Sequence, residues 1–211
     1  MSVPDLPVTL PDPLARRLAV ALDVEGKIPR ALDALGPVAN RDVALVDGEQ
    51  VRFAARLSQL GARVTPVDWS DTGAHAHAAP WADALVTCWS AFRGVVEEEL
   101  AAAAGIVRSG GRLLVVHDYG RDDISQLYAG QRERPEYGLW SRRDGPFLGN
   151  GFKVRVVHCW WTFDSVKEAQ DFVGEAFGEA GRAVAAALKR PRLSYNVAIY
   201  HRTLGTAPAR G

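Results

Sequence analysis

The sequence predicts an α/β fold in which a mostly parallel sheet is covered by helices on both faces. Short, mostly apolar runs recur at Val43–Val46, Ala84–Cys88 and Arg112–Val116, as is typical of strands buried on both faces. Segments with helical spacing lie between these runs. Strands that alternate with helices in this way form three-layer α/β sandwiches.

Composition limits the classes of protein to consider. The 211 residues, 47% of them hydrophobic, predict one ordinary globular domain. Lys plus Arg and Asp plus Glu are both 25, so no charge excess indicates a nucleic acid partner. The two cysteines lie in apolar runs and are predicted to be buried free thiols in a reducing cytoplasm. The N-terminus does not resemble a signal peptide, and no apolar run is long enough to span a membrane.

An arm and two helices are predicted ahead of the first strand. Residues 1–12 contain three prolines, Pro4, Pro7 and Pro11, and are therefore predicted to form an extended arm. Leu14–Leu22 and Ile28–Leu35 are predicted helices, and Gly36-Pro37 stops the second. The domain is expected to span residues 13–202, and residues 203–211 to form a disordered tail.

A strand–turn–helix–strand unit occupies residues 41–70. After the Val43–Val46 strand, Phe53, Leu57 and Leu60 follow helical spacing, and Gly61 ends this helix. The next strand, Arg63–Val67, runs into Asp68. Only a short spacer separates it from the Ala84–Cys88 strand.

The next helix and strand are predicted from a single apolar face and a glycine turn. Ser109-Gly110-Gly111 turns the chain into the Arg112–Val116 strand. The residues of the preceding helical face are Phe92, Val96, Leu100, Ala103 and Val107. Residues 118–150 are polar and rich in turns, which is typical of a substrate lid or an insertion.

The chain is predicted to end in strand, helices and strand. Phe152–Trp161 is a long strand in which one of the two final tryptophans should be core and the other a pocket wall or helix contact. Ser165 and Glu168 have capping-box spacing ahead of a helical run that continues, with interruptions at two glycines, to about Leu188. Ser194–Arg202 is the final strand.

This order resembles the class I S-adenosylmethionine (SAM)-dependent methyltransferases, which have a Rossmann-like fold, over about Ile28 to Arg202. The similar segments are Arg52–Ser70, Val107–Gly120 and the ending from Phe152 to Arg202. The resemblance implies a final antiparallel strand pair around a helix. The 68–83 interval is too short for the helix and strand that the family has there, so one strand–helix unit is predicted to be absent.

The resemblance also implies cofactor-binding residues. Asp68 is similar to the residue that binds the cofactor ribose, where a carboxylate accepts two hydrogen bonds. An N-cap is the alternative role for a strand-end Asp. Trp69 would stack on adenine or form a rim. Cys88 and Trp89, which end a strand, would face cofactor or substrate, or else belong to the core.

The turn after the first strand departs from the family pattern. Asp47, Glu49 and Val51 occupy positions where the family has glycines, and Gly48 is the single glycine of the turn. Each added side chain takes room that the ligand needs, and two of them add negative charge near the SAM carboxylate. The alternative alignment uses Asp47-Gly48 as the acidic-plus-glycine start of the loop.

Acid–base candidates follow the Arg112–Val116 strand. His117 beside Asp118 would act as a general base, oriented by Tyr119. The alternative is a polar turn in which Asp118 caps residues 121–125. His75 and His77 have a spacing that can bind a metal, but a third ligand is not evident, so no metal is predicted.

Two functions from different classes follow. The first is a methyltransferase-like protein with a degenerate SAM site, acting as a non-catalytic binding or assembly subunit. The second is an active SAM-dependent methyltransferase with a small-molecule acceptor. The expected partner is a small molecule or a protein, with homo-oligomerisation possible in either case, and neither a nucleic acid nor a membrane is expected.

Overall fold

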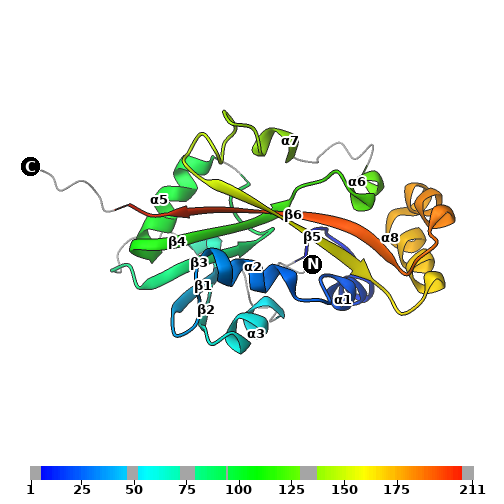
Figure 1. Cartoon of the computed structure of the whole chain (residues 1–211), viewed down its shortest axis with the longest axis horizontal. Coiled ribbons are helices and arrows are strands. Elements are labelled where there is room, and N and C mark those ends of the chain that lie inside the picture. The colour runs from blue at the N-terminus through cyan, green and yellow to red at the C-terminus, as the bar shows by residue number, and fades with distance from the viewer. Residues whose placement is uncertain (1–5, 47–51, 72–78, 94, 129–136, 206–211) are drawn as a thin grey trace, which may run out of the picture.

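The computed structural model describes residues 6–46, 52–71, 79–93, 95–128 and 137–205. They form a six-stranded sheet in the order β2-β1-β3-β4-β6-β5, with helices on both faces (Figure 1). The strands are β1 (Asp42–Val46), β2 (Arg63–Val67), β3 (Ala82–Cys88), β4 (Val107–Asp118), β5 (Lys153–Thr162) and β6 (Arg192–Thr203).

Strand directions agree with the predicted fold class. Strands β1 to β4 pair in parallel, and β6 is antiparallel to both of its neighbours, β4 and β5. Strand β2 lies at the edge, and the described residues place no further strand outside it. The predicted mostly parallel sheet with an antiparallel C-terminal strand is therefore confirmed.

The sheet separates two cores. The larger one lies under the N-terminal segment and five of the helices, and the smaller one under α5 (Val96–Ile106) and α7 (Tyr137–Trp140) (Figure 1). The helices over the larger core are α1 (Asp12–Ala21), α2 (Lys27–Leu35), α3 (Arg52–Gln59), α6 (Asp123–Leu127) and α8 (Val166–Ala187). Side chains alternate across β4, so Leu114 and Val116 face the larger core, while Leu113 and Val115 face the smaller one.

The two ends of the chain pack more closely than the sequence predicts. Leu6 and Leu10 of the expected arm are buried in the larger core. At the other end β6 continues to Thr203, and Leu204 exchanges backbone hydrogen bonds with the Gly110-Gly111 turn. Residues 1–5 and 206–211 lie outside the described residues.

Helix α5 begins at Val96, later than the predicted apolar face. Phe92 precedes it with φ of +60°, a left-handed backbone conformation that cannot continue a right-handed helix. Its ring nevertheless packs in the smaller core. Phe92 therefore has the spacing of the α5 apolar face although it lies outside the helix. Val107, at the other end of the predicted face, belongs to β4.

The polar 118–150 segment contains α6 (Asp123–Leu127) and α7 in its described part. Asp122, and not Asp118, caps α6, because its Oδ1 accepts a hydrogen bond from Ser125 N at 2.7 Å. Phe147 is fully buried and stacks on Tyr200 of β6, with ring centroids 4.0 Å apart. The described residues after α7 therefore pack on the sheet as part of the smaller core.

Three further sequence predictions can be compared with the structure. Ser165 Oγ accepts a hydrogen bond from Glu168 N, which confirms Ser165 as the N-cap of α8. Cys88 and Cys159 are both buried free thiols, as predicted. Among the described residues, no helix combines the length and the apolar character needed to cross a membrane.

Helix α8 folds back on itself at Gly178, whose φ of +58° and ψ of −125° are not helical. The fold brings buried Gly181 against the carbonyl oxygen of Val173, where a Cβ atom has no room. The second half of α8 therefore packs closely against the first because residue 181 has no side chain.

We expect Gly181→Ala to destabilise the protein by about 1–3 kcal/mol, because the two halves of α8 must separate. Gly174→Ala is the matched control, since its nearest contact would be Arg182 Cγ at an ordinary 3.6 Å. Higher helix propensity should leave that variant within about 1 kcal/mol of the parent, on the stable side. Urea unfolding measures both, and equal stabilities would contradict the close packing.

Candidate functional site

The carboxyl ends of β1 to β4 lie side by side at one edge of the sheet, where open α/β sheets bind ligands. These strands end at Val46, Val67, Cys88 and Asp118. The topology therefore brings the predicted residues 68–69, 88–89 and 117–119 to a common edge. Asp47, Gly48 and Glu49, which follow β1 directly, lie outside the described residues.

Asp68 follows β2 and is exposed to solvent. Its Oδ1 accepts hydrogen bonds from Ser70 N at 2.8 Å and Ser70 Oγ at 2.6 Å, so it caps the short 3₁₀ turn Trp69–Asp71. Trp69 is half-buried, and its ring lies 5.7 Å from that of Phe92. The structure therefore shows Asp68 in the capping role, with its carboxylate at the surface.

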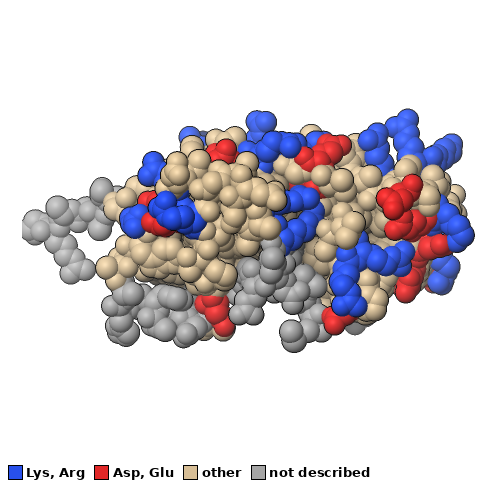
Figure 2. Space-filling view, turned by 90° about the horizontal axis from the view of Figure 1, so that it is seen from below, with Lys and Arg blue, Asp and Glu red and all other residues tan. Residues whose placement is uncertain are grey.

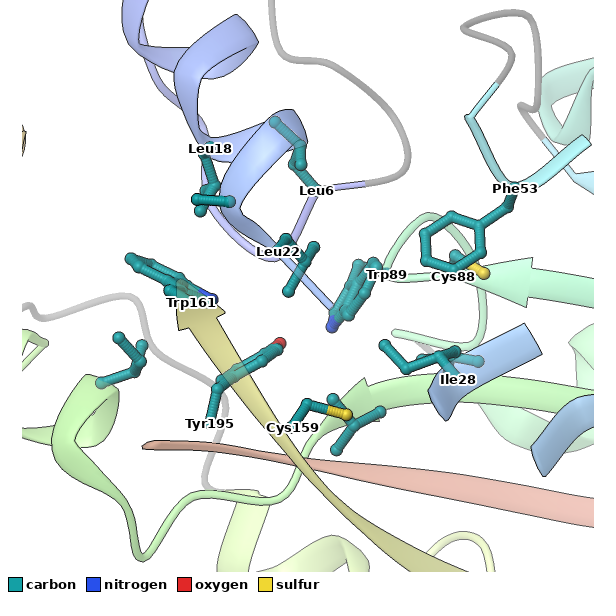
Figure 3. Packing of buried hydrophobic residues seen from close by; sticks show 14 of the residues in the cluster. Leu6, Leu18, Leu22, Ile28, Phe53, Cys88, Trp89, Cys159, Trp161 and Tyr195 are labelled. Carbon is teal, nitrogen blue, oxygen red and sulfur yellow. The ribbon is translucent and has the colours of Figure 1, made fainter. Parts of the chain in front are cut away.

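Cys88 and Trp89, at the end of β3, are buried in the larger core. The Trp89 ring packs against Phe53 at 5.9 Å and Tyr195 at 6.4 Å, and Leu22 belongs to the same cluster (Figure 3). Trp89 has φ of +59°, a strained conformation for a bulky residue. Its backbone N–H donates to the Val116 carbonyl. Because the ring is enclosed, it does not offer a face to a cofactor or substrate.

Asp118 is the centre of a buried polar cluster. Its side chain is enclosed in the larger core, and Oδ1 accepts hydrogen bonds from Trp89 Nε1 at 3.0 Å and from the Tyr195 hydroxyl. Hydrogen bonds to a carboxylate contribute about 1.5–3 kcal/mol each. The cluster joins β3, β4 and β6 at their common edge. Sequence analysis missed Tyr195, because a tyrosine inside a strand has no signal that separates it from other core residues.

His117 faces the opposite side of the sheet from Asp118. Consecutive strand residues point to opposite faces, so the predicted His117–Asp118 pair does not form. The imidazole is fully buried against Trp140 and Phe147, with ring centroids at 4.7 and 5.8 Å. Neither ring nitrogen makes a hydrogen bond of good geometry with the described residues, although the backbone of Ala91 and Phe92 lies close to the ring.

Burial, and to a smaller extent the positive charge of Arg93, lowers the pKa of His117 to about 3, although hydrogen bonding to the backbone of Phe92 and Ala91 opposes the shift. The neutral ring therefore persists through ordinary pH. Tyr119 does not orient it either. Tyr119 is half-buried, its N–H donates to the Asn196 carbonyl, and the Arg121 guanidinium lies 5.7 Å from its ring.

Two hydroxyl groups that were not predicted lie close to the end of β1. Thr87 Oγ1 and Ser90 Oγ are 3.0 Å apart, and Ser90 Oγ lies 3.4 Å from the Val46 carbonyl oxygen. Thr87 Oγ1 also accepts from Ala91 N at 3.0 Å, so this pair holds the turn after β3 against β1. No spacing rule marks such a pair, because the contact depends on the order of the strands.

We expect the depressed pKa of His117 to make folding stability depend on pH. The folded chain keeps the ring neutral down to about pH 3, whereas the unfolded chain takes up a proton near pH 6.5. The contribution of His117 to the free energy of unfolding is therefore fully present above pH 6.5. Below pH 6.5 the free energy of unfolding falls by up to about 1.4 kcal/mol per pH unit. His117→Leu should flatten this slope in urea unfolding measured between pH 7 and pH 4.

Phe147→Leu is the control for the His117 experiment, because it alters the same cluster without removing a titrating group. It should lower stability by a similar amount at every pH and leave the slope unchanged. A parent and a His117→Leu variant with identical slopes would contradict the assignment of the pH dependence to this ring.

We also expect Asp118→Leu to destabilise the fold by about 3 kcal/mol or more, because the Trp89 indole N–H and the Tyr195 hydroxyl lose their buried acceptor. Asp118→Asn keeps an acceptor oxygen and should cost less. Thermal unfolding of both variants beside Tyr195→Phe tests the cluster. Equal stability of Asp118→Leu and the parent would contradict it.

No family model matches the sequence, and no curated protein is detectably similar to it in sequence. Solved structures are similar in fold. A protein from Anaeromyxobacter dehalogenans, described as a candidate type II methyltransferase, superposes with a TM-score of 0.54 and 15% identity, covering 85% of this chain and 96% of that one. The MccD protein superposes with a TM-score of 0.50 and 12% identity, covering 83% and 96%.

A SAM-dependent methyltransferase from Thiobacillus denitrificans, solved with S-adenosyl-L-homocysteine, is 16% identical, covering 82% of this chain and 90% of that one. Its TM-score of 0.41 is too low to locate a ligand on this chain. The order of the strands and the match with the Anaeromyxobacter protein lead to the same assignment. The chain has the fold of the class I SAM-dependent methyltransferases.

Proposed function

We propose that this protein is a non-catalytic binding or assembly subunit built on the methyltransferase fold. The observation that supports it is the burial of the polar residues at the carboxyl edge of the sheet. His117 is 0% exposed and Asp118 is 2% exposed, and both are packed by aromatic rings. The partner would be a small molecule or a protein, and a second copy of the chain remains one form of that partner.

A general base must reach the proton that it removes, directly or through one water molecule. Trp140 and Phe147 enclose the His117 ring on one face of the sheet, and Trp89 and Tyr195 enclose Asp118 on the other. Neither group can reach an acceptor substrate unless these rings move. A His117 pKa of about 3 would also make this ring a weak base.

The described part of the edge fits SAM only at its ribose end. Asp68 is exposed and Trp69 is half-exposed, whereas Cys88 and Trp89 are enclosed in the core. The Asp47–Glu49 turn is poor in glycine, and side chains at these positions would take room that a bound methionine group needs.

The second candidate is an active methyltransferase with a small-molecule acceptor. Asp68 favours it, because an exposed carboxylate at the end of β2 can accept both ribose hydroxyls. SAM supplies an activated methyl group, so the protein needs to position the acceptor in line and exclude water, with or without a strong base. Asp68 would hold the ribose in this case.

Calorimetric titration with SAM and S-adenosylhomocysteine distinguishes the two candidates. We expect no binding tighter than about 1 mM, which corresponds to roughly −4 kcal/mol. A dissociation constant below about 100 μM that Asp68→Ala abolishes, in a variant that remains folded, would support the methyltransferase and overturn the non-catalytic proposal.

A gain-of-binding variant tests the reason for that expectation. Replacing Asp47, Glu49 and Val51 by glycine removes the three side chains in question and two negative charges. If the turn is what prevents binding, this triple variant should bind SAM where the parent does not. The Asp68→Ala change in the same background should abolish the gained affinity, because it removes the carboxylate at the ribose end.

A further inference from the structure

A cavity of about 510 Å³ lies at the opposite end of the sheet from Asp68. It is bounded by β5, β6, α6 and the second half of α8, at the α8 end of the molecule (Figure 1). Asp68 follows β2, which is four strand spacings, roughly 19 Å, from β6. The volume is within the roughly 300–1,000 Å³ range of small-molecule sites. This cavity is therefore separate from the candidate SAM site.

Two parts of the cavity lining are apolar. Ala183 and Ala187 lie one helical turn apart on α8, so the helix presents methyl groups to the cavity. Trp160 of β5 is a second wall, and its ring is half-buried while that of Trp161 is fully buried. The sequence predicts one core tryptophan and one that forms a pocket wall or packs against a helix, and Trp161 is the core residue. A wall of small residues and an aromatic wall suit a flat ring system.

The rim of the cavity is basic. Lys189, Arg190 and Arg192 line it, and the Arg192 guanidinium lies 4.3 Å from the Trp160 ring centroid, which holds it in place. None of these three forms an ion pair within the described part of the chain. Lys and Arg side chains are numerous at this end of the molecule, with Asp and Glu among them (Figure 2).

The carboxylates near the cavity already have hydrogen-bond or ion-pair partners. Asp123 lines it, but Asp123 Oδ2 accepts a hydrogen bond from Ser194 N at 2.8 Å, which joins α6 to β6. Glu25 lies near Arg192 and is bound to Lys27, with Nζ and Oε2 2.7 Å apart. Three cations against one lining carboxylate leave the cavity positively charged.

We propose that this cavity binds a small organic anion in which a carboxylate or phosphate group is attached to a flat aromatic ring. The ring would pack against the α8 methyl groups and the part of the Trp160 indole that Arg192 leaves uncovered. The anionic group would meet Arg192, whose planar fork of donors suits carboxylate and phosphate alike, with Lys189 and Arg190 adding positive charge. The site would give the protein a specific ligand whether or not SAM binds elsewhere.

The test uses three probes with one ring system: 1-naphthoate, 1-naphthyl phosphate and neutral 1-naphthamide. Calorimetry on the full chain should give dissociation constants of roughly 0.1–1 mM for the preferred anion, which is typical of ligands of this size. The amide should bind about tenfold more weakly, because it lacks the charge that the guanidinium recognises. Comparison of the two anions identifies whether the site prefers carboxylate or phosphate.

Variants separate the two halves of the recognition. Arg192→Gln should remove the preference for anions. Arg182→Gln removes a positive charge from the second half of α8, outside the cavity lining, and should leave the affinities for both anions within about twofold of the parent. Ala187→Leu fills the cavity from an exposed helical position and should weaken the anions and the amide alike. Circular dichroism and thermal unfolding check that each variant is folded.

Three results would overturn this proposal. They are no binding of either anion at about 2 mM, equal affinity for the anions and the amide, and affinities that Ala187→Leu leaves unchanged. Asp68→Ala should not alter naphthoate or naphthyl phosphate binding, because the two sites are at opposite ends of the sheet. Failure here and failure of the proposed function are therefore distinguishable.

Discussion

The carboxylate of Asp118 joins the parts of the molecule that meet at the carboxyl edge of the sheet. A buried carboxylate is costly unless donors surround it, and here the donors come from Trp89, after β3, and Tyr195, on β6. To reach this position Trp89 adopts a left-handed backbone, held by its hydrogen bond to Val116. The N-terminal helices and α3 then pack over the Trp89 ring. These contacts enclose the ends of β3 and β4 on this face of the sheet.

Because that cluster occupies one face of the sheet, the two polar residues at the end of β4 belong to different environments. Asp118 accepts hydrogen bonds in the larger core, while the His117 ring lies among aromatic side chains of the smaller core. Burial in these apolar surroundings keeps His117 neutral, and structural donors hold Asp118. In the structure these two residues contribute hydrogen bonds and packing at the end of β4, and a basic cavity lies near β5 and α8.

The elements best predicted from sequence were those with a strong local pattern. Val43–Val46 and Ala84–Cys88 are buried strands because a continuous apolar run fits a strand covered on both faces. Ser165 caps α8 because a hydroxyl beside a helix N-terminus satisfies a free N–H. The start of α5 was wrong, since Phe92 has helical spacing but a left-handed backbone. Hydrophobic periodicity predicts that a side chain is buried, but it does not determine the backbone conformation of that residue.

The sequence by itself determined the fold class, the direction of its strands and the grouping of residues 68–69, 88–89 and 117–119 at one edge. Local periodicity and strand order suffice for these, because parallel strands all end on the same side. Only the tertiary structure decided which of these side chains are accessible. Asp68 is exposed while Trp89, His117 and Asp118 are enclosed, since accessibility depends on side chains from distant segments, Phe53, Phe147 and Tyr195 among them. The basic cavity likewise exists because α8 folds back at Gly178 against β5 and β6, a contact that no local pattern specifies.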